Sequence, residues 1–266
     1  TLSNPTFVPK SETFATFSPR AGLAYLLGNG VRLHATVGRA FVPPSAAQLA
    51  GFWVNAWGNT TKGNPNLDPE TSITWDAGIG LDRPELGLSL DLTWFATTVD
   101  DKITTVVSGA VKTFQNSLGA EMQGVEYSAS LDLGAPLGWE QELTLFVNGT
   151  SMVKAEEEKT AGVWSDIHNV AKYTVNYGVR YDDGRFDGKL NFRTVGWMKD
   201  TDWTAAGWPE ITYPSFTVAD LVVGWNMGER HRFVLAADNL FNRDYYEKKG
   251  YPKPGRSFFL SYRYTY

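Results

Sequence analysis

Apolar and polar residues alternate along most of this chain. Between residues 88 and 96, and again between 125 and 133, apolar side chains take every second position and polar side chains take most of the others. A period of two is typical of β-strands with one apolar and one polar face. Applied to every such segment, the pattern predicts eleven strands, at residues 17–27, 30–39, 70–82, 87–99, 121–133, 140–153, 168–182, 185–198, 215–227, 231–240 and 255–266.

The connections between these predicted strands alternate in length. The short ones are 28–29, 83–86, 134–139, 183–184 and 228–230, and the long ones are 40–69, 100–120, 154–167, 200–214 and 241–254. In an antiparallel up-and-down sheet, this order places every short turn at one end and every long loop at the other. Outer-membrane β-barrels have this asymmetry. Residues 1–16 alternate little, and we expect them to belong to a further long loop.

The same alternation would arise in a soluble β-sandwich, where the apolar face packs on a second sheet. Two features favour a membrane β-barrel over a soluble sandwich. The predicted strands exceed the usual length of about 5–6 residues, and aromatic residues, 14 % of the chain, lie near strand ends, where an interfacial girdle would place them. The predicted fold class is all-β, a transmembrane antiparallel up-and-down β-barrel. Because single-chain bacterial barrels have an even number of strands, residues 1–266 are expected to form the C-terminal part of a larger one.

The composition excludes several classes of function. With 24 Lys and Arg against 29 Asp and Glu, the net charge of −5 excludes a nucleic-acid partner bound through bulk positive charge. The absence of cysteine excludes disulfides, thiolate metal sites, iron–sulfur clusters and cysteine nucleophiles. No run of 18 apolar residues could form a membrane helix. The first five residues have neither a basic nor an apolar stretch, so no signal peptide is expected.

The residues that usually carry catalysis or bind metals are sparse. Only three histidines occur, and Asp166 with His168 is the one His–carboxylate pair at a spacing that one strand face supports. Two ligands are too few for a metal site, so a solvated loop end is expected there. No Gly-x-Ser-x-Gly elbow occurs. The acidic run 156–158 could hold a divalent cation that bridges lipopolysaccharide, but we expect a solvated loop. The sequence therefore predicts neither an enzyme nor a bound metal or cofactor.

Several motifs, in the same order along the chain, resemble the barrel strands of TonB-dependent outer-membrane receptors. They are Phe17-Ser18-Pro19-Arg20-Ala21-Gly22-Leu23-Ala24-Tyr25, Gly38-Arg39-Ala40-Phe41-Val42-Pro43-Pro44, Gly63-Asn64-Pro65-Asn66-Leu67-Asp68-Pro69-Glu70, Asn116 with Gly124-Val125-Glu126, Asp238-Asn239-Leu240-Phe241-Asn242-Arg243-Asp244-Tyr245-Tyr246, and Pro254-Gly255-Arg256 before the terminal Tyr266. The resemblance covers essentially the whole chain.

The resemblance implies a barrel of about 22 strands, plugged by an N-terminal domain that this sequence lacks. It also implies active import of a scarce nutrient across the outer membrane of a Gram-negative cell, most often a ferric siderophore, with haem, cobalamin or another metal chelate as alternatives. The implied partners are outer-membrane lipid and lipopolysaccharide, the receptor's own plug, and the TonB-ExbB-ExbD complex, reached through the missing N-terminal region. Some haem receptors of the family have a His between their Phe-Arg-Ala-Pro and Asn-Pro-Asn-Leu boxes. No His lies between residues 40 and 70 here, which argues against haem ligation by this loop.

In such a barrel, two sets of residues are candidates for function. The long loops combine aromatic rings with amides, which suits flat or conjugated ligands, and the capture candidates are Trp53, Asn55, Trp57, Trp203 and Trp208. These rings could instead anchor the loops at the membrane interface. The candidates for lining the lumen and contacting the plug are Arg20, Arg32, Glu126, Arg180, Arg193 and Arg263. Two other classes stay open at this point: a passive porin or structural barrel, and a soluble glycan-binding β-domain.

Overall fold

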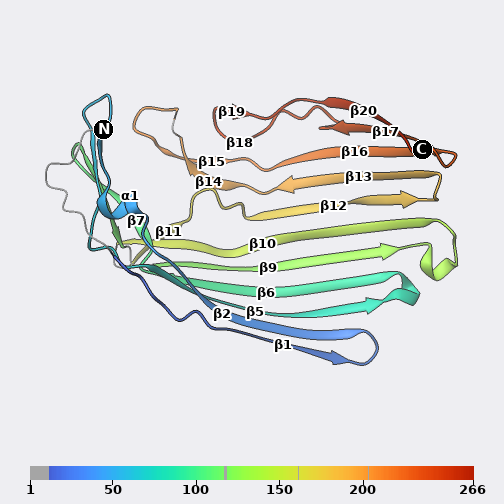
Figure 1. The fold of residues 1–266 in the computed structure, drawn as a ribbon, viewed down its shortest axis with the longest axis horizontal. Coiled ribbons are helices and arrows are strands. Elements are labelled where there is room, and N and C mark those ends of the chain that lie inside the picture. Colours follow the sequence, from blue (N-terminus) through green and yellow to red (C-terminus); the bar gives the residue numbers. More distant parts are fainter. Residues whose placement is uncertain (1–11, 117–118, 161, 203) are drawn as a thin grey trace.

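A computed structural model describes residues 12–116, 119–160, 162–202 and 204–266. Its main element is one antiparallel sheet in which eleven strands form a single ladder and neighbours along the chain are neighbours in the sheet (Figure 1). The ladder runs in the order β1 (Arg20–Leu27), β2 (Val31–Val42), β5 (Glu70–Arg83), β6 (Leu88–Asp100), β9 (Gly119–Asp132), β10 (Glu142–Thr160), β12 (Tyr173–Asp182), β13 (Phe186–Val195), β16 (Phe216–Met227), β17 (His231–Asp238) and β20 (Ser257–Tyr264).

The eleven predicted strands are confirmed, and most of their ends agree within three residues. The largest difference is at β10, which continues to Thr160 instead of ending near residue 153. Its register shifts between Met152 and Lys154, and beyond this bulge it also pairs with β11 (Val163–Asp166). A bulge reverses the side-chain alternation, which is the only signal the sequence offers, so the extension could not be predicted from it. The segment 154–167 is therefore mostly a β-hairpin.

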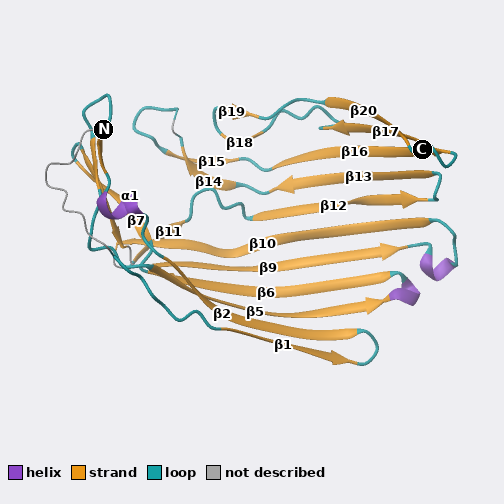
Figure 2. Ribbon diagram, viewed as in Figure 1, coloured by secondary structure: helices purple, strands orange, loops and turns teal. Residues whose placement is uncertain are grey.

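The expected separation of turns and loops is also confirmed. Figure 1 shows the short connections at one end of the sheet, here called the turn end, and the long ones at the other, the loop end. Two turns contain short 3-10 helices, η1 (Pro84–Leu86) and η2 (Ala135–Leu137), drawn at the turn end in Figure 2. Each ends in a left-handed glycine, Gly87 or Gly138. A side chain would strain these positions, which explains why glycine closes both turns.

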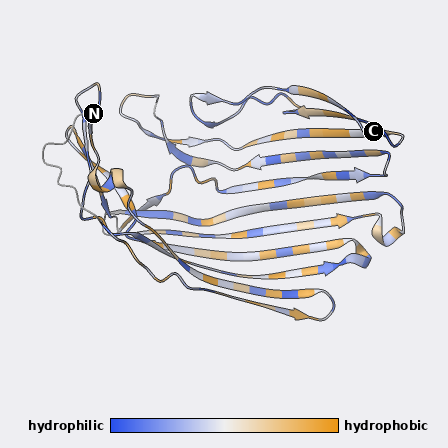
Figure 3. Cartoon of the chain, viewed as in Figure 1, coloured by the Kyte–Doolittle hydropathy of each residue, from blue (hydrophilic) through white to orange (hydrophobic). Residues whose placement is uncertain are grey.

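The two faces of the sheet differ in polarity, and Figure 3 shows the alternation along each strand. One face, here the polar face, has ion pairs that reach across an intervening strand: Arg32 on β2 lies 2.9 Å from Asp91 on β6, and Arg232 on β17 lies 2.6 Å from Asp187 on β13. On the other, apolar face, Leu92 is 52 % exposed and Tyr262 is 55 % exposed. In the described part of the chain the topology contains no second sheet of comparable size to cover these side chains. An exposed apolar face of this extent fits lipid contact and does not fit a soluble sandwich.

A row of stacked aromatic rings crosses the apolar face near the turn end. Phe186 stacks on Trp225 with ring centroids 6.3 Å apart, Trp225 on Phe233 at 5.6 Å, and Phe233 contacts Tyr262 at 5.0 Å. The rings come from the four strands β13, β16, β17 and β20. Such a band is typical of the aromatic girdle at a membrane interface.

The long connections are more ordered than expected, because they contain helix and strand of their own. The elements are α1 (Ala46–Ala50), β3 (Phe52–Val54), β4 (Thr60–Lys62), β7 (Ile103–Ser108), β8 (Val111–Asn116), β14 (Met198–Thr201), β15 (Glu210–Tyr213), β18 (Tyr246–Lys248) and β19 (Tyr251–Pro252). In the described residues, no helix is long and apolar enough to span a membrane. A small apolar core lies near the loop end, where Val195, Phe216 and Val218 pack with Tyr245.

Candidate functional site

Two of the long connections, residues 43–69 and 101–116, join in one four-stranded sheet at the loop end. Its order is β3-β4-β8-β7, and β4 pairs with β8 in parallel. Asn116 ties the connections together: its amide nitrogen donates to the carbonyls of Asp68 at 2.9 Å and Asp101 at 2.7 Å, and its oxygen accepts from the amide of Asp68. Asn64 donates to the carbonyl of Phe114 at 2.9 Å. These motif asparagines therefore hold the loops in place.

The first group of predicted capture residues lies on the β3–β4 hairpin of this sheet. Trp53 is on β3 and is half-exposed, whereas Trp57, at the tip, is 85 % exposed. The Asn55 side chain accepts from the backbone amides of Trp57 at 3.0 Å and Asn59 at 2.9 Å, so it closes the turn. The amide that the sequence offered as a ligand contact is thus engaged in building the turn, while the two rings are open to solvent.

The second group belongs to a different part of the loop end. Trp208 is exposed in the turn between β14 and β15, with a left-handed φ of 48°. Trp203 lies outside the described residues. The β14–β15 hairpin forms a sheet separate from β3-β4-β8-β7. Of the described rings, Trp53 and Trp57 therefore belong to one small sheet and Trp208 to another, and the role of the candidates in capture stays a prediction.

A buried carboxylate, Asp200, belongs to β14 of the β14–β15 hairpin. It is 1 % exposed. The hydroxyl of Tyr213 donates to its Oδ2 at 2.8 Å, and Asn169 donates to its Oδ1 at 3.0 Å. Lys248 Nζ lies 3.6 Å from Oδ2. Burial would raise the pKa of Asp200, but the hydrogen bonds from Tyr213 and the backbone of Thr201, with the charge of Lys248, outweigh it and lower the pKa. The carboxylate is therefore held ionised inside the protein.

Asp202, next along the hairpin, pairs with Lys249 and accepts from the hydroxyl of Thr204 at 2.6 Å. These contacts lower the pKa of Asp202 from 3.8 to about 2. Because the folded-state pKa is depressed, the stabilisation is complete above the ordinary pKa and is lost as the pH falls toward 2.

The pKa of Asp202 gives a prediction for the segment that Lys249 belongs to. We expect pepsin cleavage within 245–253 to increase between pH 4 and pH 2. Asp202→Asn should be cleaved at the pH 2 level already at pH 4; equal pH dependence in both proteins would contradict the assignment.

The β10–β11 hairpin contains the acidic run 156–158, which the sequence predicted to be a solvated loop. This prediction is wrong, because the run is in β10, one of its side chains pairs with another connection and a second contacts a lysine of the same strand. Glu157 pairs with Lys102, which lies between β6 and β7, and Glu156 lies 3.6 Å from Lys154. Glu157 thus links the hairpin to the connection that leads into β7.

Asp166 and His168, for which the sequence predicted a solvated loop end, each have ionic partners from other segments. Asp166, at the end of β11, lies 3.0 Å from Lys199 and 3.7 Å from Lys172. His168 lies 3.2 Å from Glu210 instead. The hydrogen bond from Lys199 is the largest cause that lowers the pKa of Asp166. Among the described residues, no group of three or more His, Cys, Asp or Glu side chains could hold a metal ion.

The six predicted lumen residues share the polar face of the sheet. Arg32 pairs with Asp91, Arg180 lies 3.9 Å from Glu142, and Arg193 pairs with Glu247 at 2.8 Å. The remaining three are placed by strand register: Arg20 opposite Gly38, Glu126 opposite Thr93 and Thr150, and Arg263 opposite Arg232. The contact of these residues with a plug stays a prediction.

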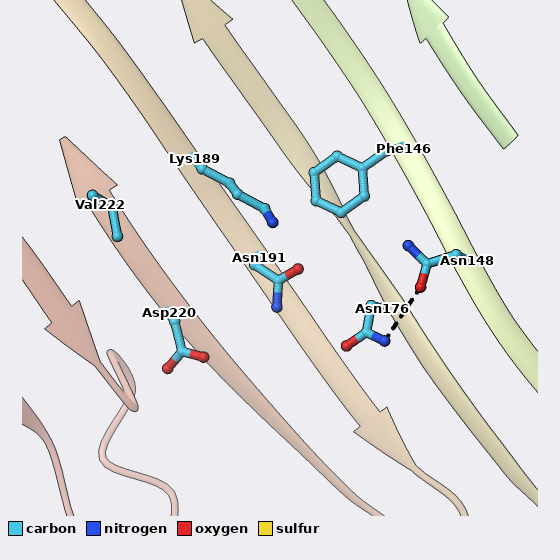
Figure 4. Close-up of a pocket in the computed structure, with 7 residues that line it drawn as sticks. All are labelled: Phe146, Asn148, Asn176, Lys189, Asn191, Asp220 and Val222. Carbon is cyan, nitrogen blue, oxygen red and sulfur yellow. Dashed lines mark hydrogen bonds between the residues drawn. The ribbon is translucent and has the colours of Figure 1, made fainter. Parts of the chain in front are cut away.

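The polar face also has a cavity of about 460 Å³ that the sequence did not single out. Figure 4 shows its lining residues, from β10, β12, β13 and β16: Phe146, Asn148, Asn176, Lys189, Asn191, Asp220 and Val222. Lys189 lies over the ring of Phe146 at 5.0 Å, and Asn176 is 3.4 Å from Asn148. In the sequence, the only sign of this cavity is that asparagine recurs at polar positions of the strands. Only the register of the strands shows that these asparagines are neighbours. The wall offers donors, acceptors and one aromatic ring to whatever fills the interior.

Known proteins share both this sequence pattern and this arrangement of strands. Residues 2–240 match the family model described as TonB dependent receptor-like, beta-barrel. Many solved structures are similar in fold, and three of them are described here. The siderophore receptor PirA from Acinetobacter baumannii has a TM-score of 0.74 and 22 % identity, over 94 % of this chain and 41 % of that chain. A ferric enterobactin receptor (PfeA) mutant from Pseudomonas aeruginosa, in complex with enterobactin, has a TM-score of 0.72 and 21 % identity, over 93 % and 40 %.

The third is a double mutant of the Serratia marcescens hemophore receptor HasR in complex with its hemophore HasA and heme, with a TM-score of 0.70 and 20 % identity, over 93 % and 39 %. At these identities the likeness concerns the fold, and this chain spans about two fifths of the length of these structures. The matched structures are of receptors and not of enzymes. The family model extends over most of the chain, including ten of the eleven ladder strands. The chain belongs to the TonB-dependent receptor β-barrel family.

Proposed function

We propose that this chain is the C-terminal barrel portion of an outer-membrane receptor that actively imports a metal chelate, in the first place a ferric siderophore. The observation that carries the proposal is the ladder itself: eleven antiparallel strands with an exposed apolar face, a polar face, and all long connections at one end. A wall of this kind separates lipid from a polar interior. The apolar face contacts the lipid of a Gram-negative outer membrane, which the chain crosses many times, and the loop end faces outside.

The rest of the receptor supplies the parts that complete transport. The remaining strands close the barrel between the edges β1 and β20, and an N-terminal plug fills the interior against the polar face. The TonB-ExbB-ExbD complex energises the receptor through that N-terminal region. In support, the described polar face carries charges of both signs, including Arg32, Glu126 and Arg193, which are the kind of group that a polar filling domain would contact.

A siderophore is favoured as substrate by the chemistry of the loop end. Trp53, Trp57 and Trp208 are exposed rings of the kind that stack on flat or conjugated groups. The segment between residues 40 and 70 contains no histidine that could ligate haem iron. Two of the matched structures are a siderophore receptor and a ferric enterobactin receptor.

The proposal is tested by uptake of radioactive iron. Cells that lack the full-length receptor regain it on a plasmid, with and without TonB, and are given ferric siderophores of the catecholate, hydroxamate and carboxylate classes. We expect one class to be taken up, and uptake to stop without TonB or when the proton gradient is collapsed. Uptake that persists without TonB would identify a passive pore, and no uptake of any chelate would contradict the substrate class.

The four tryptophans proposed to capture the ligand give a separate prediction. Stacking of one ring on a conjugated ligand contributes about 0.5–1.5 kcal/mol, so each single alanine substitution at Trp53, Trp57, Trp203 or Trp208 should weaken binding to the full-length receptor by a few-fold to about tenfold. The quadruple variant should lose more. If the quadruple variant binds the transported chelate as the native receptor does, these rings are interfacial anchors, and the barrel assignment is unaffected.

A further inference from the structure

Asp200 and Asp202 are the two acidic residues of the described chain that are almost fully buried, and Asp200, 1 % exposed, lies on a loop hairpin outside the main sheet. Burying an ionised carboxylate is unfavourable unless hydrogen bonds and a counter-charge compensate it. The compensating groups therefore have to stay in place for the hairpin to keep this conformation. The segments that supply these groups are therefore the segments that Asp200 connects.

The groups around Asp200 come from three connections that are far apart in the sequence. Asn169 belongs to the segment between β11 and β12, Tyr213 to β15, and Lys248 to β18. The Tyr213 ring is 2 % exposed, and its hydroxyl both donates to Asp200 at 2.8 Å and accepts from the backbone amide of Lys249 at 3.0 Å. The hydroxyl thus links the carboxylate to the backbone of the last long connection.

Further contacts between the same segments surround this link. The rings of Tyr213 and Tyr246 meet edge to face at 5.5 Å, and Lys249 pairs with Asp202. On the other side of the hairpin, His168 lies 3.2 Å from Glu210 and 3.2 Å from the hydroxyl of Thr201. Asp200 therefore lies at the centre of contacts that join segments 167–172, 198–213 and 245–253.

We propose that Asp200 is a positioning residue that locks these three connections into one rigid body, here called the Asp200 clamp. The hairpin that presents Trp208 then moves with the 245–253 segment and not independently of it. Preorganised loops bind a ligand without the cost of ordering them. That the clamp serves ligand capture rests on the proposed transport function; that it joins the three segments does not.

The test is hydrogen–deuterium exchange in the full-length receptor without ligand, followed in peptides from 198–213 and 245–253. Asp200→Asn keeps the size of the side chain and removes its charge, and Tyr213→Phe removes only the hydroxyl. We expect each change to speed exchange in 245–253 by at least about tenfold, although neither alters that segment, because local opening no longer has to break the buried contacts. The thermal midpoint of the barrel should stay within a few degrees.

Asp183→Asn is the matched control. Asp183 also accepts from a tyrosine hydroxyl, that of Tyr181 at 3.0 Å, but it lies in a turn at the opposite end of the sheet. This variant should leave exchange in both loop segments unchanged. Because coupling is reciprocal, Lys249→Met should in turn speed exchange in 198–213.

The outcomes separate the clamp from the transport proposal. If Asp200→Asn and Tyr213→Phe change exchange only in 198–213 and leave 245–253 within about twofold of the native rate, the segments are independent and the clamp is refuted. The same holds if Asp183→Asn has an equal effect on 245–253. A failure of TonB-dependent uptake would bear on the transport proposal alone, because the exchange measurement involves neither ligand nor transport.

Discussion

Replacing Leu92 by arginine is expected to destabilise the folded receptor by about 2–4 kcal/mol, the cost of a cationic side chain on the lipid face near the midplane of the bilayer. Leu92 lies in the middle of β6 on the apolar face, opposite Ile79 on β5 and Tyr127 on β9, and is 52 % exposed without lipid. The measurement is the denaturant midpoint of the full-length receptor refolded into phospholipid vesicles. Tyr262→Arg on β20 should have an effect of the same sign.

The control for this prediction is arginine on the opposite face. Ser128 on β9 lies opposite Asp91 on β6 and lines a polar groove, so Ser128→Arg places its charge beside a carboxylate and water. We expect a change of less than about 1 kcal/mol there, as for other partly solvated ion pairs. If arginine at Ser128 or Glu126 impairs folding more than arginine at Leu92, the assignment of the two faces is reversed.

Loss of the Asn239 side chain is expected to have the second large effect, about 3 kcal/mol for Asn239→Ala. Asn239 is 4 % exposed at the end of β17. Its amide nitrogen donates to the carbonyls of Arg243 at 2.9 Å and Pro254 at 3.2 Å, and its oxygen accepts from the amide of Arg243 at 2.7 Å. Each buried backbone group left without a partner costs about 1–3 kcal/mol. The φ of Asn239 is 48°, which adds strain for alanine.

Two variants divide this effect into its causes. Asn239→Gly relieves the strain and keeps the loss of hydrogen bonds, so it should be less destabilising than Asn239→Ala by about 1 kcal/mol. Asn242 also has a positive φ, of 53°, but it is exposed, and its side-chain oxygen accepts from the backbone amide of Arg256 at 2.9 Å. Asn242→Ala should therefore cost less. Thermal unfolding of the three full-length variants is the measurement, and equal losses at 239 and 242 would contradict the structural role of Asn239.

The fold was predictable because its main signal is local. A strand with one face toward lipid and one toward a polar interior must alternate, so the pattern around Leu92 and Ser128 contains both the strand and the identity of its faces. Strict ordering of short and long connections then fixes the up-and-down topology. The motifs around Asn116 and Asn239 identified the family, although their role in tying loops to the ends of strands is visible only in the hydrogen bonds.

The candidate site was predictable only in part, since its chemistry depends on contacts between distant segments. The sequence located exposed tryptophans in the long connections, but it did not indicate that Trp53 and Trp208 belong to separate small sheets. Asp166 and His168 are near in sequence and bind different partners, Lys199 and Glu210. The acidic run 156–158 looked like a solvated loop because a bulge after Met152 interrupts the alternation on which the prediction relied.

By itself, then, the sequence determined the number and order of the ladder strands, the polarity of their faces and the end at which the loops gather, because each depends on residues within one strand or on the spacing between strands. Only the tertiary structure decided which loops join and where charge is buried. Asp200 gives no local sign of burial: its partners Asn169, Tyr213 and Lys248 lie up to 48 residues away and meet it only after the sheet has brought their strands together. Ionic contacts between loops form only when the sheet brings distant segments together, whereas the alternation of side chains depends only on the surroundings of a single strand.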